Sequence, residues 1–374
     1  MTKKDFYKKA TKDMVITLEE IEMNIEKETL HTRQKKTHKI SRIAVAAIAG
    51  ILMVGTVSVS AYALHQWSSG TTDRFQISSA DERKYEETGV VDFPNEKDET
   101  KSITKNGITV SVAQTIVDNY FAYVSLKVAG YQVGKGKTPG FDNTDCTLDG
   151  KIVSYCSNFY DGTIDNGSGW AVLADGSEIQ KNKDGSLISN YEQKDGSLEY
   201  HIVFYSNGTK GAFFDKTLQI NLCNLGFYEK GGDFKTEKAG TWSFKWKLNG
   251  DSVSKTKKVH APLGNTGTVV SECEVSPISL RAVISMPNKK TKTQPKSEDY
   301  PFLSGVKLKD GTLLTCITNG GSEFIKKDGT REFLYYTDRI LDVNEIESLL
   351  FEKSSWKTGE PCSEENFYKV SITE

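Results

Sequence analysis

The stretch GITVSVAQTIVDNYFAYVSLKVA, residues 107–129, decides the fold class of this chain. Apolar residues occupy every second position on both sides of Asp118-Asn119, namely Ile108, Val110 and Val112 before the pair and Tyr120, Ala122, Val124, Leu126 and Val128 after it. Because successive side chains of a strand point to opposite faces, this alternation predicts a β-hairpin with one buried face.

Turn dipeptides punctuate the chain on both sides of this hairpin. Asp-Gly begins at positions 149, 161, 175, 184, 195, 310 and 328, and Asn-Gly begins at 106, 166, 207, 249 and 319. Runs rich in β-branched and aromatic residues lie between them, at 197–206, 217–229, 241–249, 268–275, 278–285 and 312–318. Short strands with such turn signals predict two β-sandwich domains, 65–250 and 251–374, with 287–301 as a long loop in the second.

Composition agrees with a globular chain of two or three domains. The chain has 374 residues, of which 26% are charged and 37% are hydrophobic. Lysine and arginine total 48 against 50 aspartate and glutamate. This balance argues against direct nucleic-acid binding, which normally requires a strongly basic domain.

Residues 43–64, IAVAAIAGILMVGTVSVSAYAL, contain no charged side chain. As a helix they would span about 30 Å, the thickness of the bilayer core, so the sequence predicts a single transmembrane helix there. Basic residues cluster just before it, at 33, 35, 36, 39 and 42, which puts residues 1–42 in the cytoplasm and 65–374 outside the cell. The alternative is a signal peptide cleaved after Ala61-Tyr62-Ala63, but the preceding region is much longer than a signal's charged leader.

The predicted cytoplasmic tail, residues 1–42, carries two short amphipathic stretches. Thr17-Leu18-Glu19-Glu20 matches a helix-capping box. Apolar residues recur at helical spacing and form a stripe that we take as the partner-binding surface: Phe6, Ala10, Met14, Leu18, Ile21 and Ile25. Helices this short are only marginally stable in water on their own. We therefore expect the apolar stripe to pack against a protein partner or, alternatively, against the inner leaflet of the membrane.

Sequence signals for phosphate binding, metal binding or catalysis are weak throughout the chain. The glycines around 130–140 resemble a phosphate loop, but the spacing is wrong and Pro139-Gly140 stands where a helix should begin. The acidic stretch 142–150 lacks the residue order of a calcium loop. Histidines at 31, 38, 65, 201 and 260 have no spacing typical of a base or ligand, so we expect most of them at the surface or on edge strands. We therefore predict no enzyme activity, no catalytic residue, no cofactor and no metal.

All six cysteines lie on the predicted outer side, where disulfides are allowed. Cys146 and Cys156 form the candidate disulfide pair. Cys223, Cys273 and Cys316 each fall within an apolar run, where a free cysteine behaves as a small hydrophobe.

The order of charged tail, Ala-rich span and β-hairpin resembles a family of single-pass anti-sigma factors of Gram-positive bacteria. Residues of the hairpin match the family's strand pair: Asn106, Gly107, Ile108, Thr109, Val110 and Asp118. Three later segments resemble the family's immunoglobulin-like domain: 240–248, 275–284 and 341–351. The tail has no cysteine and therefore lacks the His/Cys zinc module of another anti-sigma class.

The resemblance implies a membrane-anchored anti-sigma factor that takes part in signal transduction and transcription regulation. Its tail would sequester an extracytoplasmic-function sigma factor, and its β ectodomain would sense an extracellular ligand or cell-wall component. The expected partners are thus a sigma factor, the lipid bilayer and an external ligand. The alternative is a surface-anchored binding or adhesion protein whose tail is only a leader.

Overall fold

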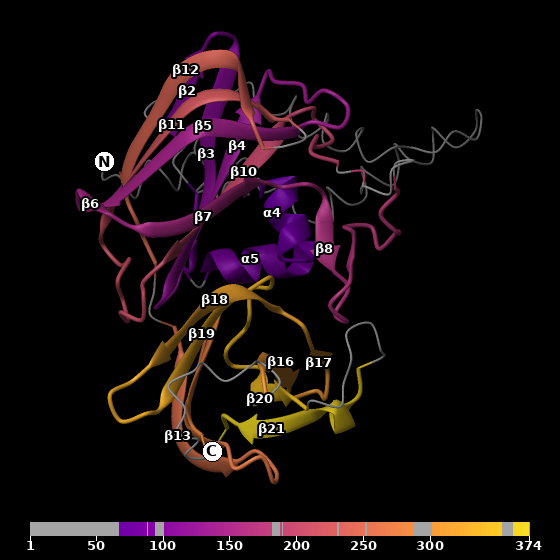
Figure 1. Cartoon of the computed structure of the whole chain (residues 1–374), viewed down its shortest axis with the longest axis vertical. Helices are drawn as coiled ribbons and strands as arrows, with labels where there is room; N and C mark the ends of the chain where they lie inside the picture. Colours follow the sequence, from indigo (N-terminus) through magenta and orange to yellow (C-terminus); the bar gives the residue numbers. More distant parts are fainter. Residues whose placement is uncertain are drawn as a thin grey trace, which may run out of the picture. The chain divides into compact units, whose positions relative to one another are not determined.

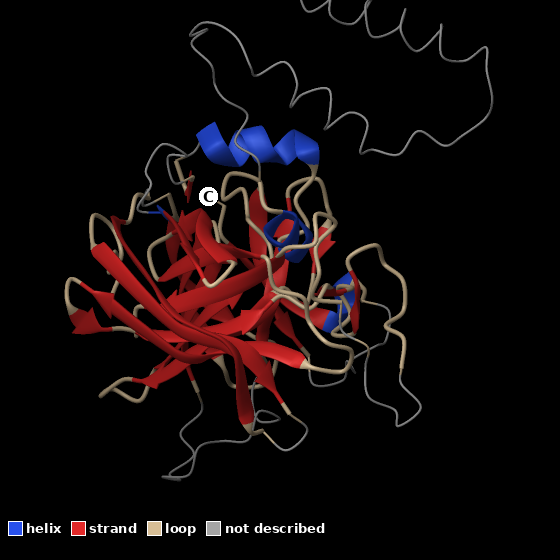
Figure 2. Cartoon of the chain, turned by 90° about the horizontal axis from the view of Figure 1, so that it is seen from above, coloured by secondary structure: helices blue, strands red, loops and turns tan. Residues whose placement is uncertain are grey.

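Antiparallel strands make up most of the described chain. The computed structural model describes residues 67–87, 89–93, 101–181, 188, 190–229, 232–250, 253–286, 301–353 and 362–373. All of them belong to one compact unit, His65–Glu374. Figure 1 labels the elements along the chain, and Figure 2 shows the strands gathered together with the helices at their margin.

The first sandwich contains two sheets and a small hairpin. The first sheet has the strand order β1-β3-β4-β10-β7, with β2 also paired to β3. Its strands are β1 Val91–Asp92, β2 Ser102–Lys105, β3 Ile108–Val117, β4 Phe121–Ala129, β7 Ser154–Phe159 and β10 Leu198–Tyr205. The second sheet has the order β12-β11-β5-β6, formed by β5 Thr138–Leu148, β6 Lys151–Ile152, β11 Thr217–Tyr228 and β12 Phe234–Lys247. The separate hairpin pairs β8 Thr163–Asp165 with β9 Ala171–Leu173.

The hairpin predicted from residues 107–129 is confirmed as β3 and β4, whose antiparallel register joins Val110 to Val128 and Val112 to Leu126. Its predicted apolar face lies in the core between the two sheets, packed with Trp242 and Phe244 of β12, except that Tyr120 belongs to a different apolar cluster. A register shift after Val112 marks a bulge, which changes the alternation for the rest of β3.

The other face of the hairpin is also buried, contrary to the prediction of one buried face. Phe121 and Tyr123 of β4 and Ile116 of β3 are 1% exposed or less. They belong to a third apolar cluster that also includes Trp67 and Phe75 from the segment before β1. The alternation missed this burial because residues distant in the sequence cover the outer face.

The second sandwich also contains two sheets. One has the order β13-β14-β15-β19-β18, formed by β13 Lys255–Pro262, β14 Val269–Ser276, β15 Ser279–Ser285, β18 Thr318–Ile325 and β19 Arg331–Thr337. The other has the order β17-β16-β20-β21, formed by β16 Leu303–Leu308, β17 Leu313–Leu314, β20 Ile346–Glu352 and β21 Phe367–Ser371, with the 3-10 helix η3 Glu364–Asn366 before β21. The change from one sandwich to the next thus falls between Lys247 and Lys255.

A separate apolar core fills the second sandwich, with Phe333 and Phe351 from opposite sheets among its fully buried side chains. The strand expected at 312–318 is shorter than predicted, because β17 covers only Leu313–Leu314. Cys316 adopts a φ of 54°, a left-handed conformation that ends an extended strand. A β-rich run therefore becomes a turn between β17 and β18.

The fold class needs one correction, because the expected helices are not shown. No helix within the described ranges is long and apolar enough to cross a membrane. The two α-helices there are α4 Ser69–Arg74 and α5 Ser79–Glu87, and their six and nine residues extend only about 9 and 14 Å against a bilayer core of about 30 Å. The predicted span 43–64 and helical tail 1–42 lie outside the described residues. The described residues form a mainly β structure with several sheets.

The turn of the first hairpin ties the two sandwiches together. Asp118 is fully buried, and its Oδ1 accepts the backbone N–H groups of Tyr120 and Phe121, both at 2.9 Å. Its Oδ2 accepts the N–H of Ile278 at 3.2 Å and the hydroxyl of Ser279 at 2.7 Å, both from the second sandwich. One carboxylate therefore satisfies donors of both sandwiches.

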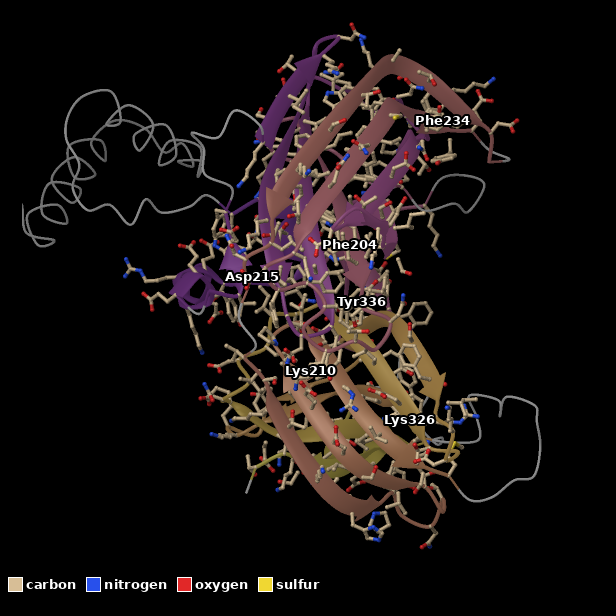
Figure 3. All side chains as sticks on the ribbon, turned by 90° about the vertical axis from the view of Figure 1, so that its left-hand side faces the viewer. Phe204, Lys210, Asp215, Phe234, Lys326 and Tyr336 are labelled. Atoms are coloured by element: carbon tan, nitrogen blue, oxygen red, sulfur yellow. The ribbon has the colours of Figure 1, made fainter. Side chains whose placement is uncertain are left out.

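Neighbouring side chains extend this contact. Asn119 Nδ2 and the Tyr120 hydroxyl donate to the two oxygens of Glu274 at 3.0 and 2.9 Å, and Lys210 pairs with the same carboxylate at 2.6 Å. The ring of Tyr336 lies 5.7 Å from that of Phe121. Figure 3 labels Lys210 and Tyr336, which both lie where the strands of the two sandwiches approach each other.

We expect Asp118→Asn to lower the free energy of unfolding by about 3 kcal/mol, because an amide NH₂ would replace one of two buried acceptor oxygens and leave its donors unpaired. Urea denaturation followed by tryptophan fluorescence measures the change. The control is Asp328→Asn, an exposed turn carboxylate that bonds only Thr330, and it should cost less than about 0.5 kcal/mol. Equal losses in the two variants would show that Asp118 is an ordinary turn residue.

Candidate functional site

The residues predicted to bind a partner are Phe6, Ala10, Met14, Leu18, Ile21 and Ile25, and they lie outside the described residues. Their role stays a prediction. The site described here is instead built from α4, the sheet beneath it and a pocket that both sandwiches line.

The candidate disulfide is not formed, since Cys146 and Cys156 are both free thiols. Cys146 on β5 points into the first core, where burial raises its pKa to about 12. Cys156 on β7 is exposed, because Tyr155 and Ser157 on either side of it face inward and alternate residues of a strand face opposite ways. The two sulfur atoms therefore lie on different sides of a sheet.

A buried carboxylate holds the start of α4. Glu199 on β10 is 2% exposed, and its Oε1 accepts the backbone N–H of Gly70 at 2.7 Å. Its Oε2 accepts the hydroxyls of Ser68 at 2.9 Å and Ser125 at 3.3 Å. Burial acts to raise the pKa of Glu199, but its hydrogen bonds, with that of His201 the largest, outweigh it and lower the pKa. The carboxylate is thus charged at neutral pH and fixes the chain at the entry to α4.

His201 lies beside Glu199 on the same face of β10, two residues along the strand. Its Nε2 is 3.2 Å from Glu199 Oε2, and its ring stacks on that of Tyr160 at 5.4 Å. Burial lowers its pKa, so the ring is neutral at neutral pH and donates from Nε2. Its Nδ1 is buried and has no hydrogen-bond partner in the described part of the chain. The sequence predicts most histidines at the surface or on edge strands; His260 is exposed on the edge strand β13, whereas His201 is buried on a central strand. The other three histidines lie outside the described residues.

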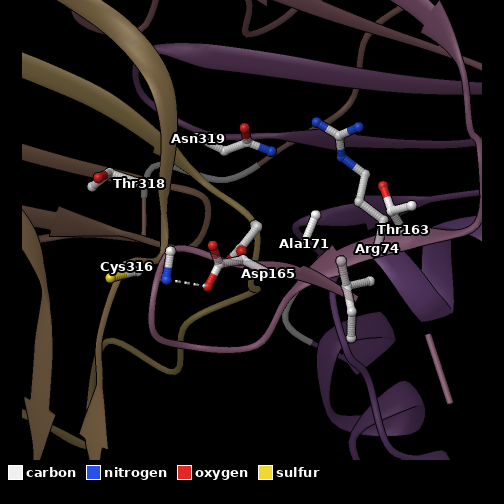
Figure 4. Close-up of a pocket in the computed structure, with 10 residues that line it drawn as sticks. Arg74, Thr163, Asp165, Ala171, Cys316, Thr318 and Asn319 are labelled. Atoms are coloured by element: carbon white, nitrogen blue, oxygen red, sulfur yellow. Dashed lines mark hydrogen bonds between the residues drawn. The ribbon is translucent and has the colours of Figure 1, made fainter. Parts of the chain in front are cut away.

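The other end of α4 lines a pocket of about 280 Å³, which we call the junction pocket. The first sandwich contributes Arg74 of α4 and Thr163 and Asp165 of β8, and the second contributes Cys316, Thr318 and Asp338. In Figure 4, Arg74 and Thr163 lie on one side of the pocket and Cys316 and Thr318 on the other. An occupant would therefore contact both sandwiches.

Among the residues that the structure describes, two buried polar atoms at this pocket have no hydrogen-bond partner. The side chain of Asp338 is 8% exposed, and its Oδ1 makes no hydrogen bond, although Arg339 Nε lies 4.0 Å away. Burial raises the pKa of Asp338 to about 7. Arg74 Nε is likewise buried and unpaired, and the guanidinium lies 5.7 Å from the centre of the Tyr123 ring. Unpaired buried donors and acceptors are rare, so these two atoms are the polar groups at the pocket whose hydrogen bonding the described contacts do not satisfy.

The β8–β9 loop is held in place across the junction. Asp165 Oδ1 accepts the N–H groups of Gly167 at 2.6 Å and Gly169 at 3.2 Å, the latter drawn as a dashed line in Figure 4. The carbonyl of Gly167 accepts the hydroxyl of Thr315 from the second sandwich at 2.6 Å. The wall of the pocket is therefore preorganised.

Comparisons with known proteins give no family. No protein-family profile matches the chain, and no curated protein matches it. A solved structure described as the conserved domain protein from Bacillus anthracis is similar with a TM-score of 0.38 and 13% identity. The match covers 71% of this chain and 82% of that chain.

We expect Gly70→Val to release α4, because a Cβ at position 70 would lie 2.6 Å from Glu199 Oε2 and 2.9 Å from the Tyr160 ring. Opening of α4 should raise the rate of trypsin cleavage after Arg74 about tenfold or more. The control Ser69→Val changes an exposed neighbour on the same helix and should leave that rate unchanged. Equal cleavage of both variants would mean that Glu199 does not hold the helix.

Asp338 should make stability depend on pH. The pKa of Asp338 is about 7 in the folded chain and exceeds the ordinary value of 3.8. Protonated Asp338 therefore adds its full contribution to the free energy of unfolding below about pH 4, and this contribution is lost as the pH rises through 7. Between about pH 5 and 7 we expect wild type to lose up to about 1.4 kcal/mol per pH unit relative to Asp338→Asn. Urea unfolding of both proteins at several pH values measures this difference. Parallel pH profiles would contradict the assignment.

Proposed function

We propose that this chain is a non-enzymatic regulatory protein whose N-terminal segment sequesters an extracytoplasmic-function sigma factor. In this proposal the two sandwiches receive the signal that ends the sequestration. The resemblance of residues 106–110 and Asp118 to the anti-sigma family supports it. The observation that carries it is the attachment of α4 to the buried carboxylate of Glu199, because α4 directly follows the N-terminal segment.

The helix α4 connects the two roles. At its first turn, Ser68 and Gly70 are bonded to Glu199, and at its end Arg74 lines the junction pocket. A solute that binds the pocket differently when α4 is docked and when it is released would shift the balance between these two states. The N-terminal segment would then sense the occupancy of the pocket through the chain that precedes α4.

Sequestration would use the apolar stripe that contains Leu18, Ile21 and Ile25. These residues have the spacing of one helix face, and an amphipathic helix binds a partner by laying such a face into an apolar groove. If the segment becomes helical only on binding, the entropy cost of ordering it lowers the binding affinity. The complex with the sigma factor would therefore be reversible. No cofactor is needed for this chemistry.

A second candidate function is an extracellular binding or adhesion protein. A cavity of the first sandwich lined by Phe141, Phe159, Tyr200 and Tyr228 favours it, because concave sites lined by aromatic side chains are where proteins commonly bind ligands. In that case residues 2–30 would be dispensable. The two functions therefore differ in what the N-terminal segment does.

We expect Leu18→Asp with Ile21→Asp to raise transcription from the promoter of the cognate sigma factor, because two carboxylates in an apolar groove oppose binding. A reporter gene in the native host measures transcription, and an immunoblot checks the protein level. We expect an increase of about tenfold or more, the effect of losing about 1.4 kcal/mol or more of binding.

The control is Glu19→Ala with Glu22→Ala, which changes polar positions of the same segment and should leave transcription low. Unchanged transcription in the Asp variant at normal protein level would contradict sequestration. Deletion of residues 2–30 adds a further arm. A phenotype that survives this deletion would favour the binding or adhesion function instead.

A further inference from the structure

A second cavity opens at the side of the first sandwich, away from the Asp118 contact. It has a volume of about 370 Å³ and lies between β5 of one sheet and β7 of the other. Strand β7 pairs only with β10, and β5 pairs with β6 through Thr147 and Leu148 alone. Across the described residues, the remaining edge of β5 has no strand partner. We call this cavity the edge cleft.

The floor of the edge cleft is a rigid cluster of rings. Phe141, Phe159 and Tyr200 line it and are each 5% exposed or less. The ring of Phe141 lies 5.6 Å from Phe159 in a stacked arrangement and 5.0 Å from Tyr200 in an edge-to-face arrangement. Rings packed in this way lose little freedom when a ligand binds.

The rim of the cleft presents an exposed ring in a fixed position. Tyr228 at the end of β11 is 41% exposed and lines the cleft. Its ring covers Gly140 so closely that a Cβ there would lie 2.5 Å from Tyr228 Cε2. Phe234 packs edge-to-face against it at 5.2 Å. Tyr228 is thus an aromatic platform that is both supported from behind and open to solvent.

The polar groups of the cleft are hydroxyls and an amide. The hydroxyl of Tyr200 is 2.7 Å from Ser157 Oγ and 3.1 Å from Thr144 Oγ1. Asn158, which lines the cleft, donates through Nδ2 to the carbonyl of Phe159, which leaves its Oδ1 as an acceptor. Groups of this kind exchange neutral hydrogen bonds with a ligand.

Charge is nearly absent from the lining. Asp161 is the single ionisable carboxylate there, and its Oδ1 is already occupied by Thr163. Within the described part of the chain, no lysine or arginine lines the cleft. An anionic ligand would therefore have no counter-charge in the cleft.

We propose that the edge cleft binds a neutral oligosaccharide. The C–H face of one sugar ring would lie on Tyr228, and its hydroxyls would exchange hydrogen bonds with Thr144, Ser157 and Tyr200. A pyranose combines an apolar face with a rim of uncharged hydroxyls, and the edge cleft presents the matching surfaces. This inference concerns a different site from the junction pocket and does not depend on sigma-factor binding.

The test is isothermal titration of the full chain with linear tetrasaccharides of glucose and of N-acetylglucosamine. Wild type should bind at least one of them at millimolar concentration or below. Tyr228→Ala should weaken that binding about tenfold or more, and Tyr228→Phe should retain most of it because the ring remains. Trp170→Ala is the matched control, since Trp170 is 60% exposed and lies outside the cleft lining.

Three outcomes would overturn the proposal. One is that wild type binds neither tetrasaccharide. Another is that Tyr228→Ala and Trp170→Ala lose affinity equally, which would indicate nonspecific contact with exposed rings. The third is that an extended peptide, added along the free edge of β5, binds in a Tyr228-dependent manner while both sugars do not. None of these outcomes alters the transcription test, so the two proposals fail separately.

Discussion

The structure depends on one buried carboxylate, Asp118, that accepts four hydrogen bonds from two sandwiches. Burial raises the pKa of Asp118, while its hydrogen bonds with Ser279, Tyr120, Phe121 and Ile278 act in the opposite direction. A carboxyl group without access to water is tolerated where such donors replace the lost solvation. Two of its donors belong to its own turn and two belong to the second sandwich. One carboxyl group therefore provides hydrogen-bond acceptors both for the turn and for the contact between the sandwiches. The same two sandwiches that Asp118 joins both contribute residues to the lining of the junction pocket.

Much of the β architecture was predictable from local pattern. The alternation in residues 107–129 gave β3 and β4 because strand periodicity is a property of neighbouring residues. The burial of Phe121 and Tyr123 on the opposite face was not predictable, since it requires Trp67 and Phe75 to pack there. The short β17 was missed because a single left-handed residue, Cys316, interrupts a run with good strand propensity.

The candidate site was largely hidden from sequence reasoning. Positions 199 and 201 share a face of one strand, which the period of two reveals, but their burial depends on α4. Arg74 and Asp338 lie in different sandwiches, and no local signal connects them. Asp118 is the exception, because the sequence alone places it at the turn of the hairpin and in the motif that resembles the anti-sigma family. The expected disulfide failed for a related reason, since spacing alone does not tell which face a cysteine occupies.

The docking of α5 has a consequence for how the chain matures. The Tyr85 hydroxyl donates to the carbonyl of Ile340, 255 residues later, and Lys84 pairs with Asp342. Synthesis proceeds from the N-terminus, so α5 is made long before Ile340 and Asp342, the residues that it contacts. The helix can dock only after almost the whole polypeptide has been synthesised. A nascent or C-terminally clipped chain would lack the Tyr336 ring that packs on Phe121 and Tyr205, so part of the aromatic outer face of the first sheet would be exposed. Exposed apolar surface of this kind makes incompletely folded chains prone to aggregation.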